Sequence, residues 1–144
     1  MEHPKFVGDR TTLAVMIALH ETRIPFLVPL GENTRYDLGI EWNGQLVRVQ
    51  CKSGRLRGGA VEFATCSWYG HHPNPKVVSR MYTGEIDFFA VYCRETSGVY
   101  LIPIAEVPTR SYAKLRVDPA RNNQRRRIRY AADYEIAKVS VVAA

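Results

Sequence analysis

The feature that most constrains this chain is a β-hairpin signal within residues 35–52. Asn43-Gly44 is typical of a two-residue type I′ turn, because both central residues of that turn need a positive φ, which Asn and Gly tolerate best. Such a turn pairs Trp42 with Gln45, so the numbers of paired residues sum to 87. The pairing predicts that Asp37 lies directly opposite Gln50.

The two predicted faces of this hairpin differ in chemistry. Side chains alternate along a strand, so Asp37, Gln50 and Lys52 share one face, while the other is filled by Leu38, Ile40, Val47 and Val49. Asp37, Gln50 and the backbone carbonyl of Cys51 offer the oxygen ligands that suit a hard divalent metal ion. Lys52 is placed to orient a water or to stabilise charge on a phosphoryl oxygen. The alternative interpretation is an ordinary solvated hairpin face.

Composition and charge limit the possible classes of protein. A chain of 144 residues with 46% hydrophobic content predicts a single domain, residues 1–144, with a real core. The net charge of +6 suits a polyanionic partner. Three widely spaced cysteines without a Cys-x-x-Cys motif indicate neither a disulfide framework nor a zinc site, which is typical of a cytoplasmic protein. No signal peptide or membrane-spanning stretch is expected.

The order of apolar segments predicts an α/β fold. Asp9 is expected to be the N-cap of a helix over 10–22, in which Leu13, Met16, Ile17 and His20 recur at helical spacing. Strands are expected at 26–28, in the hairpin, and at 61–65, 86–93, 99–104 and 115–117. The expected architecture is a mixed β-sheet of about five strands with the N-terminal helix packed on it.

Basic segments surround these elements and are candidates for nucleic-acid contacts. Residues 53–59 predict a Gly-rich loop in which Arg55 and Arg57 contact phosphates. Further candidates are, in chain order, Lys76, Arg80, Asn123, Gln124, Arg125 and Arg126. Basic loops are also common on proteins that bind no nucleic acid, and that alternative remains open.

Four stretches resemble the PD-(D/E)XK nuclease superfamily, and their residues are more similar still to its group I intron-associated, homing-endonuclease-like branch. They are residues 8–13 (GDRTTL), 29–38 (PLGENTRYDL), 48–54 (RVQCKSG) and 87–92 (DFFAVY). The branch is similar in fold to archaeal Holliday-junction resolvases. The resemblance implies a restriction-endonuclease-like core, Mg²⁺-dependent cleavage of double-stranded DNA with Mn²⁺ able to substitute, and a homo-oligomer, either a dimer or a tetramer.

The resemblance also implies roles for single residues. Asp37 matches the metal-binding aspartate, Gln50 the position that is usually Asp or Glu, and Lys52 the catalytic lysine. The superfamily often adds a glutamate on the first helix in a Gly-x-x-x-Glu pattern, and here Thr12 stands at that spacing after Gly8. The nearby acids that can substitute are Asp9 and Glu32. Three functions stay open: a homing or restriction-like endonuclease, a junction resolvase, and a DNA-binding protein that has lost the chemistry.

Overall fold

The computed structural model describes residues 2–31, 33–70, 77–107, 111–119 and 128–143. That part of the chain holds the following helices and strands: α1 (Pro4–Glu21), β1 (Phe26–Leu27), β2 (Leu38–Trp42), β3 (Gln45–Arg57), β4 (Ala60–Ala64), β5 (Cys66–Gly70), β6 (Val77–Met81), β7 (Phe88–Cys93), β8 (Gly98–Pro103), β9 (Tyr112–Arg116) and α2 (Ile136–Ala143). Two short 3-10 helices, Ile104–Glu106 and Ala131–Asp133, precede β9 and α2.

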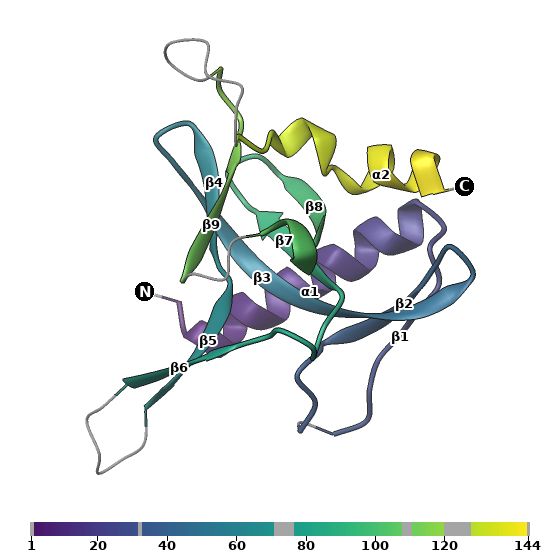
Figure 1. Cartoon of the computed structure of the whole chain (residues 1–144), viewed down its shortest axis with the longest axis horizontal. Coiled ribbons are helices and arrows are strands. Elements are labelled where there is room, and N and C mark those ends of the chain that lie inside the picture. The colour runs from purple at the N-terminus through teal and green to yellow at the C-terminus, as the bar shows by residue number, and fades with distance from the viewer. Residues whose placement is uncertain (1, 32, 71–76, 108–110, 120–127, 144) are drawn as a thin grey trace.

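Strand β3 is the centre of the main sheet (Figure 1). Its first half pairs antiparallel with β2, and the register runs from Leu38 opposite Val49 to Trp42 opposite Gln45. Asn43 and Gly44 both have positive φ, of 52° and 75°. The predicted turn and its pairing sum of 87 are therefore confirmed.

The sheet is mixed, as predicted, but it is larger than expected. Strand β7 pairs parallel with β3, whereas the other pairings in the sheet are antiparallel. It contains seven strands among the described residues, in place of about five. Strand β3 continues into a second hairpin with β4, near the strand expected at 61–65, and β9, near the strand expected at 115–117, then pairs with β4 in the same sheet.

The predicted Gly-rich loop at 53–59 is wrong for most of its length. Strand β3 runs through it to Arg57, which lies opposite Ala60 of β4. The turn itself consists of Gly58 and Gly59, with φ of 55° and 78°, which is the backbone that a two-residue hairpin turn needs. Gly54 lies inside the strand for a different reason, which is close packing.

Helix α1 begins six residues earlier than expected. Its N-cap is His3, whose side chain accepts a hydrogen bond from the backbone N–H of Lys5, so Asp9 is not the N-cap. The buried face contains Thr11, Val15 and Leu19. Of the predicted apolar face, Met16 packs against the core, whereas Leu13 and Ile17 are turned outward and are 58% and 59% exposed.

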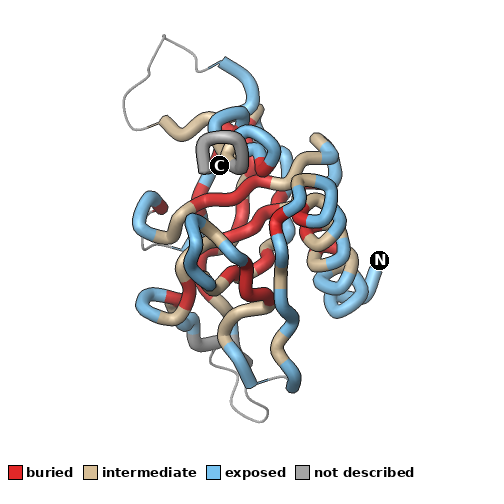
Figure 2. The backbone as a smooth tube through the Cα atoms, turned by 90° about the vertical axis from the view of Figure 1, so that its right-hand side faces the viewer, coloured by how far each residue is buried: buried red, intermediate tan, exposed pale blue. Residues whose placement is uncertain are grey.

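Two hydrophobic clusters cover opposite faces of the sheet, because neighbouring residues of each strand point to opposite sides. Val49, Ala90 and Leu101 pack in the cluster that includes the buried residues of α1. Phe89 and Val91 belong to the other cluster, with residues of β4 and β9. The buried strands form the centre of the molecule, and the outer side of α1 is exposed (Figure 2).

A separate two-stranded sheet, β5 paired with β6, extends away from the body (Figure 1). Its base joins the main sheet at Cys66 and Tyr82, which are both buried. We call this projecting hairpin the arm. Among the described residues, no helix has both the length and the apolar character of a membrane span.

Gly54 and Gly8 give a paired test of this packing. A Cβ atom at Gly54 would lie 2.7 Å from Val61 Cγ1 and 2.8 Å from Val91 Cγ1. We expect Gly54→Ala to lower the free energy of unfolding by about 1–3 kcal/mol, because the core has no room for it. At Gly8, inside α1, a Cβ atom meets nothing within 4 Å.

Gly8→Ala is the control and should raise the free energy of unfolding by about 0.5–1 kcal/mol, because alanine favours the helix. Urea unfolding of both variants followed by circular dichroism measures the difference. Equal effects of the two substitutions would contradict the packing described for Gly54.

Candidate functional site

The candidate site lies where one edge of β3 has no strand partner. Pairing with β2 ends at Val49, and pairing with β4 begins at Arg55. Over the interval 50–54 the only strand paired with β3 in the described part of the chain is β7, on the opposite edge. Backbone groups of this interval are therefore available to side chains or ligands.

Asp37 occupies this open edge. Its backbone N–H donates to the Val49 carbonyl at 2.9 Å, which ends the β2–β3 ladder. Its carboxylate oxygen Oδ2 then accepts the backbone N–H of Cys51 at 2.9 Å. Burial raises the pKa of the Asp37 carboxyl above its ordinary value of 3.8, while the Cys51 N–H and the charge of Lys52 oppose part of that rise.

The backbone carbonyl of Cys51 lies on the same edge as the Asp37 carboxylate. In a strand the N–H and C=O of one residue point to the same side, and the Cys51 N–H points at Asp37. The Cys51 thiol lies on the α1 side of the sheet, where burial and the charge of Asp37 raise its pKa, so it stays protonated. Cys51 is thus suited to bind a metal ion through its backbone carbonyl oxygen and not through its thiol.

A pocket of about 320 Å³ joins these groups to helix α1. Asp37, Gln50 and Cys51 line one side, and the other side is formed by the first half of α1 with Lys5, Gly8, Asp9, Thr11 and Thr12. The structure therefore brings together three predicted metal-site residues, Asp37, Gln50 and Cys51. It also brings in Asp9, which the sequence had favoured as a helix cap.

Thr12 does not supply an acid to this pocket, and its hydroxyl donates to the Gly8 carbonyl at 3.2 Å. Asp9 is exposed on the same helix and lines the pocket that contains Asp37. The other substitute considered from the sequence, Glu32, lies outside the described residues. Across the described part of the chain, no three His, Cys, Asp or Glu side chains gather into a metal-binding cluster.

The side chain of Lys52 is held in place by the arm and by Tyr82, the residue that follows the arm. Its Nζ atom donates to the Cys66 carbonyl at 3.2 Å and to the Tyr82 hydroxyl at 3.1 Å, and it lies 4.7 Å from the centre of the Tyr82 ring. Tyr82 is itself fixed by an edge-to-face contact with Phe89, with ring centres 5.7 Å apart. The lysine therefore has a defined position at the junction of β3 and the arm.

Arg35 is the residue of this region that sequence reasoning missed. Its guanidinium stacks 4.0 Å from the centre of the Tyr82 ring and pairs with Glu85 at 3.1 Å. It also donates to Ser67 Oγ at 2.8 Å and to the Met81 carbonyl at 3.0 Å, both in the arm. The sequence held two signals for it: position 35 faces position 52 in the predicted hairpin register, and Arg35 lies within the stretch 29–38 that resembles the nuclease superfamily.

The predicted nucleic-acid contacts are only partly described. Arg55 and Arg57 are exposed on β3, two residues apart, so they share a face of that strand. Arg80 is exposed on the arm and pairs with Glu85 at 3.1 Å. Five further candidates lie outside the described residues: Lys76, Asn123, Gln124, Arg125 and Arg126.

Comparison with known proteins agrees with this arrangement. The family model described as PD-(D/E)XK endonuclease matches residues 2–137. Among solved structures, the bacterial homing endonuclease I-Ssp6803I is similar, with a TM-score of 0.75 and 23% sequence identity. The alignment covers 98% of this chain and 94% of that one. A search of curated protein sequences finds no significant match.

The Arg35 network leads to a stability prediction. The side chain of Arg35 is only 15% exposed, so its loss leaves acceptors of the arm without this donor and takes from Glu85 the less exposed of its two arginine partners. We expect Arg35→Gln to lower the free energy of unfolding by about 1–3 kcal/mol, measured by urea unfolding.

Arg80→Gln is the matched control, because Arg80 pairs with the same Glu85 but its side chain is 55% exposed. Its loss should cost about 0–1 kcal/mol, as for other surface ion pairs. A loss after Arg35→Gln no larger than that of the control would refute a structural role for this network.

Proposed function

Because the chain belongs to the PD-(D/E)XK endonuclease family, we propose that it is a divalent-metal-dependent DNA endonuclease of the homing or restriction kind, which hydrolyses phosphodiester bonds in double-stranded DNA. One observation carries this proposal. The Asp37 carboxylate is held at the edge of β3 that has no strand partner, beside the carbonyl of Cys51. Lys52 is the next residue of β3 after Cys51. The donors in this arrangement suit Mg²⁺, and Mn²⁺ as a substitute, because both prefer oxygen ligands.

The proposed roles follow from the chemistry of each group. Asp37 and the Cys51 carbonyl, with the Gln50 amide oxygen, would hold the metal ion. When bound, such an ion lowers the pKa of a water molecule and polarises the phosphate. Lys52 is positively charged and fixed by the Tyr82 hydroxyl and the Cys66 carbonyl, so it is available to stabilise charge on a phosphoryl oxygen or to orient the attacking water.

We further propose that Asp9 supplies the second carboxylate of the site. The helix position at which the superfamily often has glutamate is Thr12 here, and Thr12 hydrogen-bonds to its own helix. Asp9 lies one turn earlier, and it faces the pocket that contains Asp37 and Gln50. A second carboxylate would strengthen the binding of Mg²⁺, which one carboxylate and neutral oxygens hold weakly.

DNA binding without cleavage is the second candidate function, and the composition of the site favours it. Gln50 is neutral, and within the described residues the pocket of Asp37 offers only Asp9 as another acid. A site with too few carboxylates would retain the fold and the basic surface while losing the metal. The two candidates differ in the cleavage assay.

The first test is cleavage by site variants. We expect the protein to cut supercoiled plasmid DNA with Mg²⁺ or Mn²⁺ and not with EDTA. Asp37→Ala and Lys52→Ala should each lower the rate by about 100-fold or more, because they remove a metal ligand and a charge-stabilising group, while DNA binding by gel shift persists. Linear duplex and a four-way junction are assayed in parallel, and preference for the junction would identify a resolvase.

Failure to cut any of these substrates with either metal, while DNA binding remains, would establish the second candidate. Cleavage that survives both Asp37→Ala and Lys52→Ala would show that the active site lies elsewhere.

The role of Asp9 is tested by the metal dependence of the rate. We expect Asp9→Asn to raise the Mg²⁺ concentration for half-maximal cleavage by about tenfold, and high Mg²⁺ should restore part of the rate, because the substitution removes one negative ligand. Glu21→Gln removes the same charge at the other end of α1 and is the control. An unchanged Mg²⁺ dependence in Asp9→Asn would exclude Asp9 as a ligand.

We also propose that the active form is a homo-oligomer, a dimer or a tetramer. One site per chain cuts one strand, so cutting a duplex on both strands generally needs two copies related by symmetry. Light scattering after gel filtration, with and without DNA, measures the oligomeric state.

A further inference from the structure

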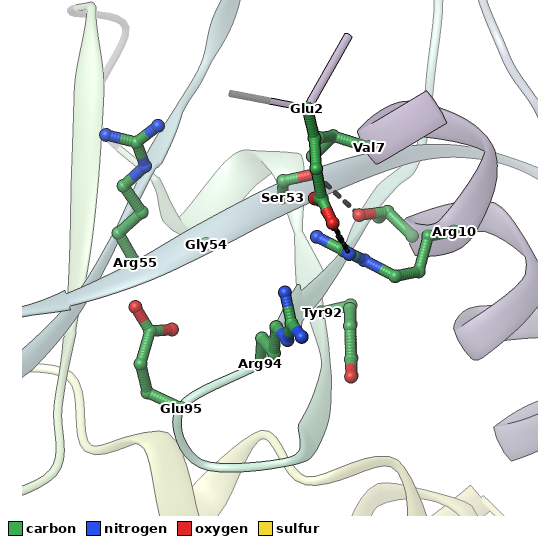
Figure 3. A pocket seen from close by; sticks show the side chains of 10 residues that line it. Glu2, Val7, Arg10, Ser53, Gly54, Arg55, Tyr92, Arg94 and Glu95 are labelled. Carbon is green, nitrogen blue, oxygen red and sulfur yellow. Dashed lines mark hydrogen bonds and ion pairs between the residues drawn. The ribbon is translucent and has the colours of Figure 1, made fainter. Parts of the chain in front are cut away.

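A second pocket, separate from the one that contains Asp37, is lined by three arginines from different parts of the chain (Figure 3). Arg10 comes from α1, Arg55 from β3 and Arg94 from the turn between β7 and β8. The pocket has a volume of about 260 Å³. This is smaller than the roughly 300–1,000 Å³ of a site for a drug-sized ligand, so it suits a small anionic group.

The arginines of this pocket are only partly neutralised. Arg10 Nη1 lies 2.9 Å from Oε2 of Glu2 and 3.1 Å from its Oε1, so both oxygens of this carboxylate face one guanidinium nitrogen. Glu95 lines the pocket too, and its carboxylate accepts a hydrogen bond from the Cys93 thiol at 3.3 Å. Within the described residues, the guanidinium groups of Arg55 and Arg94 form no hydrogen bond and no ion pair within 4.0 Å, although Arg55 lies near enough to Glu95 for its charge to help lower the pKa of that carboxyl.

The pocket lies directly beside the candidate active site. Thr11 and Ser53 line both pockets, and their hydroxyls hydrogen-bond to each other across the boundary between α1 and β3. Strand β3 passes from Gln50 and Cys51 on one side of this boundary to Arg55 on the other. At about 3.3 Å per residue, four to five residues span about 13–17 Å.

This separation matches the spacing of charges along DNA. Consecutive phosphates of one strand of B-form DNA rise by roughly 3.4 Å along the helix axis and lie farther apart than that in space, because the backbone winds around the axis, so about 13–17 Å spans only a few phosphates. Arginine binds phosphate well because its fork of N–H donors can contact two phosphate oxygens at once. Ser53, at the boundary, adds a hydroxyl donor.

We propose that the Arg10–Arg55–Arg94 pocket binds a backbone phosphate of the DNA strand that enters the active site, a few nucleotides from the phosphate to be cleaved. In the free protein Glu2 occupies part of this place as an internal anion, paired with Arg10. DNA phosphate displaces the Glu2 carboxylate, so the charge of Glu2 opposes DNA binding. This proposal rests on the proposed function, because it presupposes duplex DNA as the substrate.

The test measures duplex DNA binding at several salt concentrations by fluorescence anisotropy, in EDTA so that no cleavage occurs. Arg94→Gln should weaken binding on the order of fivefold, equally for different sequences, and reduce the slope of log affinity against log salt by about 0.9, the value for one lost phosphate contact. Glu2→Gln should have the opposite effect and strengthen binding on the order of threefold.

Two control variants remove the same charges at the far end of α1. Arg23→Gln neutralises an exposed arginine just beyond the helix, and Glu21→Gln neutralises its last residue. Glu21 lies 10 residues beyond Thr11, the last residue of α1 that lines the pocket, and is therefore about 15 Å from it along the helix axis, with Arg23 farther on. Binding by both should stay within twofold of wild type.

The proposal is overturned if Arg94→Gln keeps the wild-type salt slope, if Glu2→Gln does not tighten binding, or if Arg23→Gln weakens binding as much as Arg94→Gln. It is also overturned if the wild-type protein binds no duplex DNA, and in that case the proposed function fails with it. A wild-type protein that cuts plasmid DNA, with Arg94→Gln unchanged in binding, would refute the phosphate pocket alone.

Discussion

The arrangement of the site depends on the hydrogen bond from the Cys51 N–H to the Asp37 carboxylate. A strand edge that is partly buried must satisfy its backbone groups, and an unsatisfied N–H costs about 1–3 kcal/mol. Had β2 continued one residue pair further, its backbone would have taken this bond and closed the edge. Because β2 begins only after Asp37, a side chain satisfies the N–H, and the neighbouring carbonyl stays on an edge without a strand. The Asp37 carboxylate thus lies at the start of the interval 50–54, over which β3 pairs with β7 alone in the described part of the chain.

A second constraint links this edge to the arm. Tyr82, 3% exposed, presents its ring to Arg35 and its hydroxyl to Lys52, and both cations also bond to backbone carbonyls of the arm. Two positive charges beside one ring repel each other, and the pairing of Arg35 with Glu85 offsets part of that repulsion. Displacement of the arm would therefore change the surroundings of Lys52. In the proposed nuclease, a contact that moves the arm would therefore also move the side chain of Lys52.

The sequence predicted features that arise from local chemistry. Asn43-Gly44 fixes a turn, and the turn fixes the register that sets Asp37 beside Cys51. Contacts between distant segments could not be predicted in this way, since nothing near Lys52 indicates a partner 30 residues later in Tyr82. The prediction of which face of α1 is buried was wrong for a similar reason. Residues 11, 15 and 19 recur at helical spacing, as residues 13, 17 and 20 do, and only packing on the sheet selects the first set, which includes a polar threonine.

The charges around the site bear on how a metal ion would bind in the proposed function. Burial already disfavours the charged form of Asp37, and the pocket adds only Asp9 as a second acid, against the nearby cations Lys5 and Lys52. Without DNA, such a site binds a divalent cation weakly. A DNA phosphate entering the same pocket brings oxygen ligands and negative charge, so it raises the affinity for the metal, and by thermodynamic linkage the metal raises the affinity for DNA by the same factor. A poor site in the free protein is therefore compatible with an effective one in the complex, because the substrate supplies the charge that Thr12 and Gln50 do not.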